Sequence, residues 1–102
     1  MKPSEALRRH RRKILQIAES ARVRNVRVFG STARGEDRED SDLDLLVDAT
    51  EHTSLFDLGG MTIDLEALLT VRVDIVTSGS LSALPAHRRA MAAQIMAEAK
   101  PI

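Results

Sequence analysis

Residues 26–48 read VRVFGSTARGEDREDSDLDLLVD, and this stretch decides the fold because two apolar runs flank a polar connection. The first run, Val26 to Phe29, predicts a strand that ends at Gly30. The second run, Leu43 to Val47, is apolar except for one aspartate and predicts a well-buried strand. Between these strands we expect a turn or a short helix from Ser31 to about Asp37.

Helical periodicity appears on both sides of this stretch. Residues 4–21 place apolar side chains on one face, which predicts a helix that starts after Pro3 with Ser4 as its cap. Residues 54–69 predict a second helix, in which Gly59-Gly60 marks a kink or a break. The residues of this helix expected in the core are Leu55, Leu58, Ile63, Leu65, Leu68 and Leu69.

The last third of the chain predicts one more strand and one more helix. Val71 to Thr77 is the strand, Ser78-Gly79-Ser80 is a turn, and Pro85 suits the first position of the helix. The side chains expected to face inward there are Leu84, Met91 and Ile95, with Ala92, Met96 and Ala99 beside them.

The order α-β-α-β-α-β-α predicts one α/β (α+β) domain over residues 1–102, with a small mixed three-stranded core sheet flanked by helices. Because a helix joins the second and third strands, those two strands should be parallel.

Composition excludes several classes of protein. The chain has 29% charged and 43% hydrophobic residues, no cysteine, and no apolar run near the roughly 18 residues of a membrane span. Disulfides and thiolate chemistry are therefore excluded, and we expect a cytoplasmic protein. Residues 1–38 hold 11 Lys and Arg against 4 Asp and Glu, and residues 39–102 hold 4 against 11. With zero net charge and only Phe29 and Phe56 as aromatic residues, nucleic acid is an unlikely partner.

Asp42 and Asp44 are the first candidates for chemistry. Side chains two residues apart on a strand point to the same face, so both carboxylates should project from one spot. Two ionised carboxylates repel each other, and a divalent cation relieves that repulsion with the oxygen ligands that Mg²⁺ prefers. The alternative is an acidic loop edge, because Asp-x-Asp alone is a weak signal.

Gly30 and Ser31 stand where the first strand ends, and Asp74 lies within the third strand. Glycine allows close backbone approach, and N–H groups after it can hold a phosphate, with the Ser31 hydroxyl as a further donor. A plain turn capped by Ser31 is the alternative. Asp74 is a carboxylate in an apolar strand and needs a cation or several donors, so it either joins the first two aspartates or pairs with Arg72.

Gly30-Ser31, ten intervening residues and Asp42-Leu43-Asp44, followed by Val73-Asp74-Ile75-Val76, resemble the DNA polymerase beta-like nucleotidyltransferase superfamily. Within this superfamily, the small size of the chain and its segments GSTARG and SDLDLLV resemble the minimal nucleotidyltransferase (MNT) group. The resemblance covers nearly the whole chain from Val26 onward.

This resemblance implies a nucleotidyltransferase fold and a site with two Mg²⁺ ions, or Mn²⁺, held by Asp42, Asp44 and Asp74. Gly30 and Ser31 would contact the terminal phosphates of ATP, and Asp74 would help to deprotonate or orient the acceptor hydroxyl. Arg34 either reaches the triphosphate or pairs with Glu36, Asp40 or another acid.

The resemblance also implies a partner. Small MNT proteins resemble antitoxins that pair with HEPN-domain toxins, so we expect transfer of AMP from ATP to a toxin tyrosine, with release of pyrophosphate. A second hypothesis is a non-catalytic module that neutralises its partner by occlusion. A third is nucleotidyl transfer to a small molecule or an RNA end.

Overall fold

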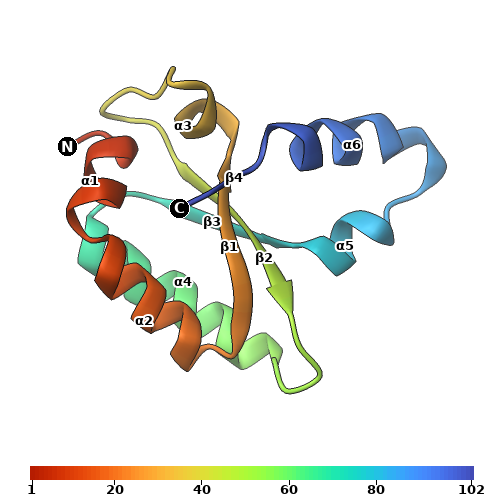
Figure 1. The fold of residues 1–102 in the computed structure, drawn as a ribbon, viewed down its shortest axis with the longest axis horizontal. Helices are drawn as coiled ribbons and strands as arrows, with labels where there is room; N and C mark the ends of the chain where they lie inside the picture. The colour runs from red at the N-terminus through yellow and green to blue at the C-terminus, as the bar shows by residue number, and fades with distance from the viewer.

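A computed structural model describes all 102 residues, and a twisted sheet of four strands forms its centre (Figure 1). The elements in chain order are α1 (Pro3–Arg9), α2 (Arg11–Ser20), β1 (Val23–Phe29), α3 (Gly30–Arg34), β2 (Leu43–Ala49), α4 (Leu55–Leu69), β3 (Val73–Thr77), α5 (Ser78–Ser82), the 3₁₀ helix η1 (Ala86–Arg88), α6 (Arg89–Glu98) and β4 (Lys100–Pro101). The predicted mixed α/β architecture is confirmed.

The strands lie side by side in the order β3-β2-β1-β4. β2 and β3 are parallel, as the helix between them predicts, and β1 is antiparallel to both of its neighbours. The fourth strand was not predicted from the sequence, because a pair of residues is too short to show strand periodicity. It pairs only with Arg27 and Val28 of β1.

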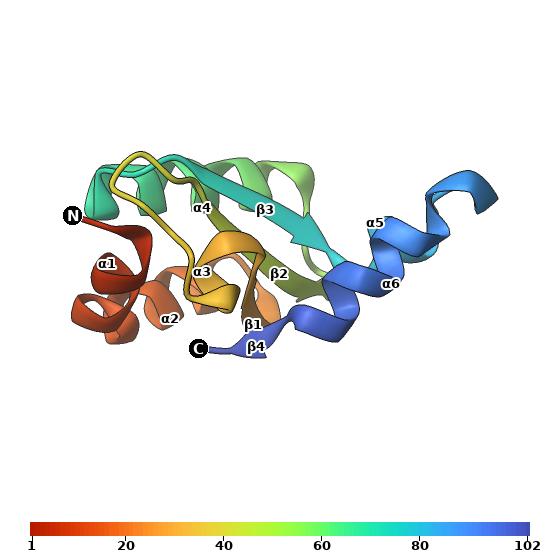
Figure 2. The same cartoon turned by 90° about the horizontal axis from the view of Figure 1, so that it is seen from above.

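Helices cover the two faces of the sheet unequally. Helices α1, α2 and α4 pack on one face, where alternate residues of β2 (Leu43, Leu45 and Val47) are fully buried. Seen from above, α5 and α6 extend to one side of the sheet (Figure 2). They cover part of the opposite face through a smaller cluster that contains Phe29, Leu46 and Leu81. Because strand residues alternate between faces, Asp44 shares this second, less covered face with Leu46.

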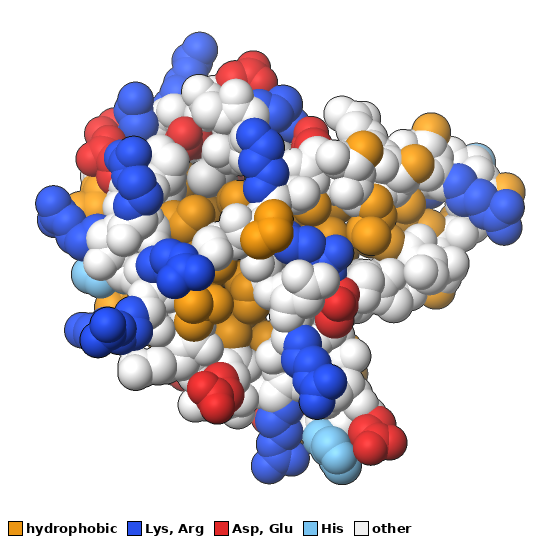
Figure 3. All heavy atoms as spheres, viewed as in Figure 1, with side chains coloured by type: hydrophobic (Ala, Val, Ile, Leu, Met, Phe, Trp, Pro, Cys, Tyr) orange, Lys and Arg blue, Asp and Glu red, His pale blue; other side chains and the backbone are white.

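The predicted helix over residues 4–21 is two helices. The backbone departs from helical geometry at His10, with φ −114° and ψ 19°, and α2 begins at the next residue. Ser4 is not the cap: Lys2 holds that position, and the Ser4 N–H donates to Asp37 Oδ2 at 2.8 Å. The arginines of these helices point outward, and Figure 3 shows basic side chains gathered over them.

Helix α4 runs unbroken through Gly59-Gly60, so the break that the sequence left open there does not occur. Ser54 and Asp57 form a reciprocal capping box at its start, and Met61, Leu65 and Leu69 are buried against the sheet. This capping and burial outweigh about 1 kcal/mol of lost helix propensity per glycine.

The helix face that enters the core matches the prediction in part, since Leu65 and Leu69 are buried and Leu58 and Leu68 pack against the core. Leu55 and Ile63 were expected in the core, yet they are 86% and 68% exposed. The buried residues of the helix are Met61, Leu65 and Leu69. Sequence alone does not determine which edge of a broad apolar stripe meets the sheet.

The C-terminal third also differs in detail. Ser78 to Ser82 forms helix α5 rather than a turn, with the Thr77 side chain as its cap. Pro85 precedes η1, and α6 begins only at Arg89. Met91 is 47% exposed instead of facing inward, because α6 covers only the margin of the sheet. No helix of the structure combines the length and the apolar character needed to cross a bilayer.

Candidate functional site

The parallel pairing of β2 with β3 brings two of the predicted aspartates together. Asp44 and Asp74 are register partners on these neighbouring strands. Register partners project from the same face of a sheet, and adjacent strands lie about 4.8 Å apart. Asp42 stands two residues before Asp44, where the chain enters β2. Two carboxylates on neighbouring strands and a third just before β2 therefore lie near one end of the sheet, on its less covered face.

The electrostatics of this cluster centre on Asp44. Burial, together with the neighbouring charges of Asp74 and Asp42, raises the pKa of Asp44 to about 6, and the charge of Arg34 partly opposes this shift. Asp44 is half-buried, whereas Asp42 and Asp74 are exposed. Asp74 is exposed although its strand is otherwise apolar, and β3 is an edge strand of the sheet. Arg72 is not its ion-pair partner among the salt bridges of the structure.

The donor set of the cluster suits a hard divalent cation. It consists only of carboxylate oxygens, and the pKa of Asp44 is raised by burial first and by the charges of Asp74 and Asp42 second, so a bound cation would favour its ionised form. As the side chains stand, no three of the carboxylates or imidazoles in the chain are gathered closely enough to form a complete metal cage. Asp42 and Asp74 are exposed and so free to change rotamer.

Gly30 connects β1 to α3 directly beside Asp44. Its φ is +71°, a conformation that favours glycine, and a Cβ at this position would collide with Asp44 Oδ2. The turn therefore needs glycine for two separate reasons. Ser31 follows at the start of α3, half-buried, and its hydroxyl makes no hydrogen bond within the chain, so it is not a helix cap.

Arg34 lies at the end of α3 and is held by two acids. Its Nε donates to Glu36 Oε1 at 2.8 Å, and its Nη1 donates to Glu98 Oε2 at 3.0 Å. Of the two roles that the sequence left open for Arg34, this structure shows the ion pair, with Glu36 and Glu98 as partners and not Asp40.

Glu98 is the residue of the site that sequence reasoning missed. It is the last residue of α6, and its Oε1 accepts the Gly30 N–H at 2.9 Å. This hydrogen bond lowers the pKa of Glu98, and Arg34 adds to the effect. Glu98 is the only acid after Asp74 in the chain. That isolation is a weak signal, and only the fold shows where the side chain goes.

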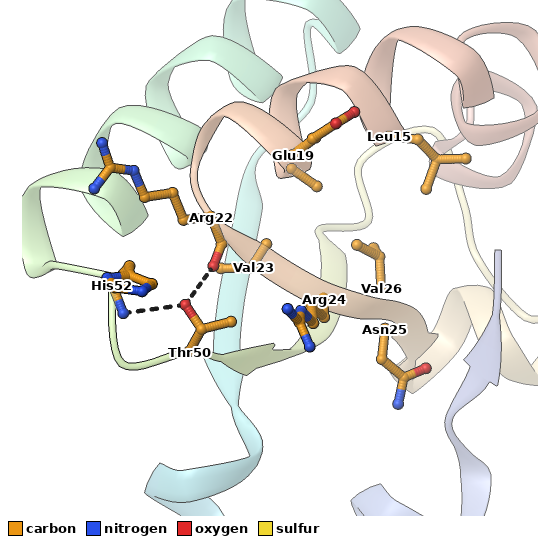
Figure 4. A pocket seen from close by; sticks show the side chains of 10 residues that line it. Leu15, Glu19, Arg22, Val23, Arg24, Asn25, Val26, Thr50 and His52 are labelled. Atoms are coloured by element: carbon orange, nitrogen blue, oxygen red, sulfur yellow. Dashed lines mark hydrogen bonds between the residues drawn. The ribbon is translucent and has the colours of Figure 1, made fainter.

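The largest hollow of the molecule lies elsewhere. It measures about 650 Å³ and lies between the end of α2, the first half of β1 and the loop after β2 (Figure 4). Thr50 holds that loop in place, since its hydroxyl donates to the Arg22 carbonyl and accepts from the His52 N–H. Glu19 is the only carboxylate in the lining, so the hollow offers no counterpart to the aspartate cluster.

Comparison with known proteins shows the family to which the chain belongs. The model of the nucleotidyltransferase domain family matches residues 7–98. The protein adenylyltransferase MntA of Thermococcus cleftensis is 48% identical over 66 residues, which cover 65% of this chain and 67% of the relative.

Solved structures of other proteins share the fold of this chain. A minimal nucleotidyltransferase matches with a TM-score of 0.80 and 43% identity, over 97% of this chain and 95% of the other. A toxin–antitoxin complex solved with AMP-PNP shares the fold at a TM-score of 0.68 and 21% identity, over 88% of this chain and 69% of the matched chain. With the paired aspartates beside a glycine-serine turn, these matches identify the chain as a member of the nucleotidyltransferase domain family, of the minimal type.

Proposed function

We propose that this chain is an antitoxin that transfers AMP from ATP to a tyrosine hydroxyl of a HEPN-domain toxin and releases pyrophosphate. The observation that carries the proposal is the pairing of Asp44 with Asp74 on parallel strands, with Asp42 two residues away and Gly30 against Asp44. The relative from Thermococcus cleftensis is named as a protein adenylyltransferase, and a solved neighbour of the same fold belongs to a toxin–antitoxin complex with AMP-PNP.

The reaction is an in-line displacement at the α-phosphorus of ATP. The tyrosine oxygen forms a bond to that phosphorus, the bond to the bridging oxygen of the β-phosphate breaks, and pyrophosphate leaves. Asp74, exposed at the edge strand, would orient the tyrosine hydroxyl and accept its proton. The exposed edge leaves room for the side chain of a protein acceptor, which is large and approaches from outside.

Asp42, Asp44 and Asp74 would hold two divalent cations, most simply Mg²⁺. When bound, such a pair of ions supplies positive charge to both the attacking and the leaving oxygens. Asp44 is suited to this role because burial and its two neighbours make its ionised form unfavourable without a cation.

Gly30 and Ser31 would receive the terminal phosphates. The Ser31 hydroxyl has no partner within the chain and is free to donate to a phosphate oxygen. The guanidinium of Arg34 lies at the same turn, and there it can stabilise charge on the leaving pyrophosphate.

The test is to incubate the purified chain with a HEPN-domain toxin encoded beside it, ATP and Mg²⁺, and to weigh the toxin by mass spectrometry. The proposal expects a gain of one AMP on a tyrosine, absent with Asp44→Ala or when that tyrosine is replaced by phenylalanine. A stable complex without any mass gain would instead indicate neutralisation by occlusion. Mass gain on an added RNA or small molecule alone would reassign the acceptor.

A further inference from the structure

Two groups proposed above to meet the triphosphate are already occupied in the structure. The Gly30 N–H and the Arg34 guanidinium both donate to one carboxylate, that of Glu98. Each carboxylate oxygen takes one donor, Oε1 from the backbone and Oε2 from the arginine. A carboxylate held by a backbone N–H and a guanidinium uses the same kind of donors that would hold a phosphate oxygen.

Glu98 lies between two elements of the fold, the body of helix α6 before it and strand β4 after it. It ends α6, and two residues later the chain pairs with β1 as strand β4 at Arg27 and Val28. The side chain is 19% exposed, against 64% for Glu36, the other acid on Arg34. Glu98 is thus a defined occupant of the turn, whereas Glu36 lies at the solvent side of the arginine.

Helix α6, which carries Glu98, is loosely attached. None of its residues is buried, and its contacts with the sheet come through half-buried side chains such as Ile95. Exposed Met91 and Met96 lie on the same helix. Little packing therefore opposes a shift of α6 if the Glu98 carboxylate leaves the turn.

We propose that Glu98 gates the nucleotide site: its carboxylate occupies the Gly30 N–H and Arg34 until a triphosphate displaces it, releasing the end of α6. This inference rests on the proposed function. The physical reason is competition, because a donor already bound to Glu98 is not available to a phosphate, and the carboxylate also repels the polyanion. The apparent affinity for nucleotide is then the intrinsic affinity multiplied by the fraction of molecules in which Glu98 does not hold the turn.

The test compares nucleotide affinity in matched variants by calorimetry. Glu98→Gln keeps the shape and removes the charge, and Glu98→Ala removes both contacts. Glu36→Gln is the control, since it also takes an acid from Arg34 but leaves Gly30 untouched. Each protein is titrated with Mg²⁺-ATP and with inorganic tripolyphosphate, which has no base or sugar.

We expect both Glu98 variants to bind both probes roughly tenfold tighter than the wild type, the size of one charge-assisted hydrogen bond. Glu36→Gln should stay within about twofold of the wild type. Equal or weaker binding by Glu98→Gln, with wild-type binding intact, would overturn the gate and leave Glu98 as a support for the turn. Failure of all four proteins to bind either probe would instead remove the proposed function and the gate with it.

Discussion

Asp44 of β2 and Asp74 of β3 are register partners on parallel strands, so their carboxylates leave the same face of the sheet at the same level. Hydrophobic side chains follow both residues along the strands toward Leu46 and Val76, which belong to the smaller core cluster. The two acids are therefore placed by the sheet itself rather than by a mobile loop. A rigid scaffold of this kind suits a site in which small displacements strongly reduce the rate.

Asp42→Ala and Asp44→Ala should each abolish AMP transfer. Each removes a carboxylate proposed to hold cation, and loss of such a group lowers kcat by about 10²-fold or more. Neither carboxylate belongs to the hydrophobic core, so circular dichroism should show a folded protein. The measurement is the rate of AMP incorporation into the toxin. Wild-type rates in both variants would refute the assigned roles.

Asp44→Asn should stabilise the protein near neutral pH. The folded-state pKa of Asp44, about 6, lies above its ordinary 3.8, so the native state holds this proton more tightly than the unfolded state. Ionising Asp44 in the folded state therefore lowers the free energy of unfolding. This loss is absent below about pH 4, grows between pH 4 and 6, and is complete above pH 6. The melting temperature of Asp44→Asn should exceed that of the wild type at pH 7.5, and the gap should narrow at pH 4.5. Asp40→Asn, in the exposed loop, serves as the control. A difference in melting temperature that does not change with pH would contradict the raised pKa of Asp44.

Added Mg²⁺ should raise the melting temperature of the wild type. Anything that binds only the native state stabilises it, and each kcal/mol corresponds to about 4–8 °C in a chain of this size. Differential scanning fluorimetry across a Mg²⁺ titration, against NaCl of equal ionic strength, measures the effect. Asp44→Asn should lose most of the shift and Asp40→Asn should keep it. An equal shift in all three proteins would place the cation elsewhere.

Gly30→Ala should destabilise the fold more than Gly35→Ala does. Both glycines have positive φ, +71° and +73°, so both substitutions carry about 1–2 kcal/mol of backbone strain. Only at Gly30 does the new methyl group collide with Asp44, because nothing lies within 4 Å of a Cβ at Gly35. Comparing the two variants by urea unfolding separates the cost of the collision with Asp44 from the cost of backbone strain. AMP transfer should fall only with Gly30→Ala. Equal destabilisation would mean that Asp44 simply moves aside.

Leu65→Ala should cost about 2–5 kcal/mol of unfolding free energy, because it leaves a cavity under α4. Leu65 is fully buried, whereas Ile63 on the same helix is 68% exposed. Ile63→Ala should therefore change the free energy of unfolding by less than about 0.5 kcal/mol, because the side chain lies at the surface. Chemical denaturation of both variants provides the comparison. A large loss with Ile63→Ala would show that this face of α4 is covered in solution.

Periodicity predicted most helices and strands, because apolar spacing directly reflects which face is buried. The parallel pairing of β2 with β3 also followed from the sequence, since a helix of the length of α4 joins them. The break at His10, the helix at Ser78–Ser82 and the exposure of Leu55 did not follow. Each of these depends on what packs against the segment, and local propensity does not contain that information.

By itself, the sequence determined that Asp42 and Asp44 share one spot and that Gly30 ends the preceding strand, because alternation along a strand and the conformational freedom of glycine are local properties. Only the tertiary structure decided that Glu98, 68 residues beyond Gly30, reaches that turn and takes its N–H. The sheet order places β4 beside β1 and so returns the end of α6 to the site. A contact made across such a separation depends on the packing of the whole chain, and no spacing within the sequence encodes it.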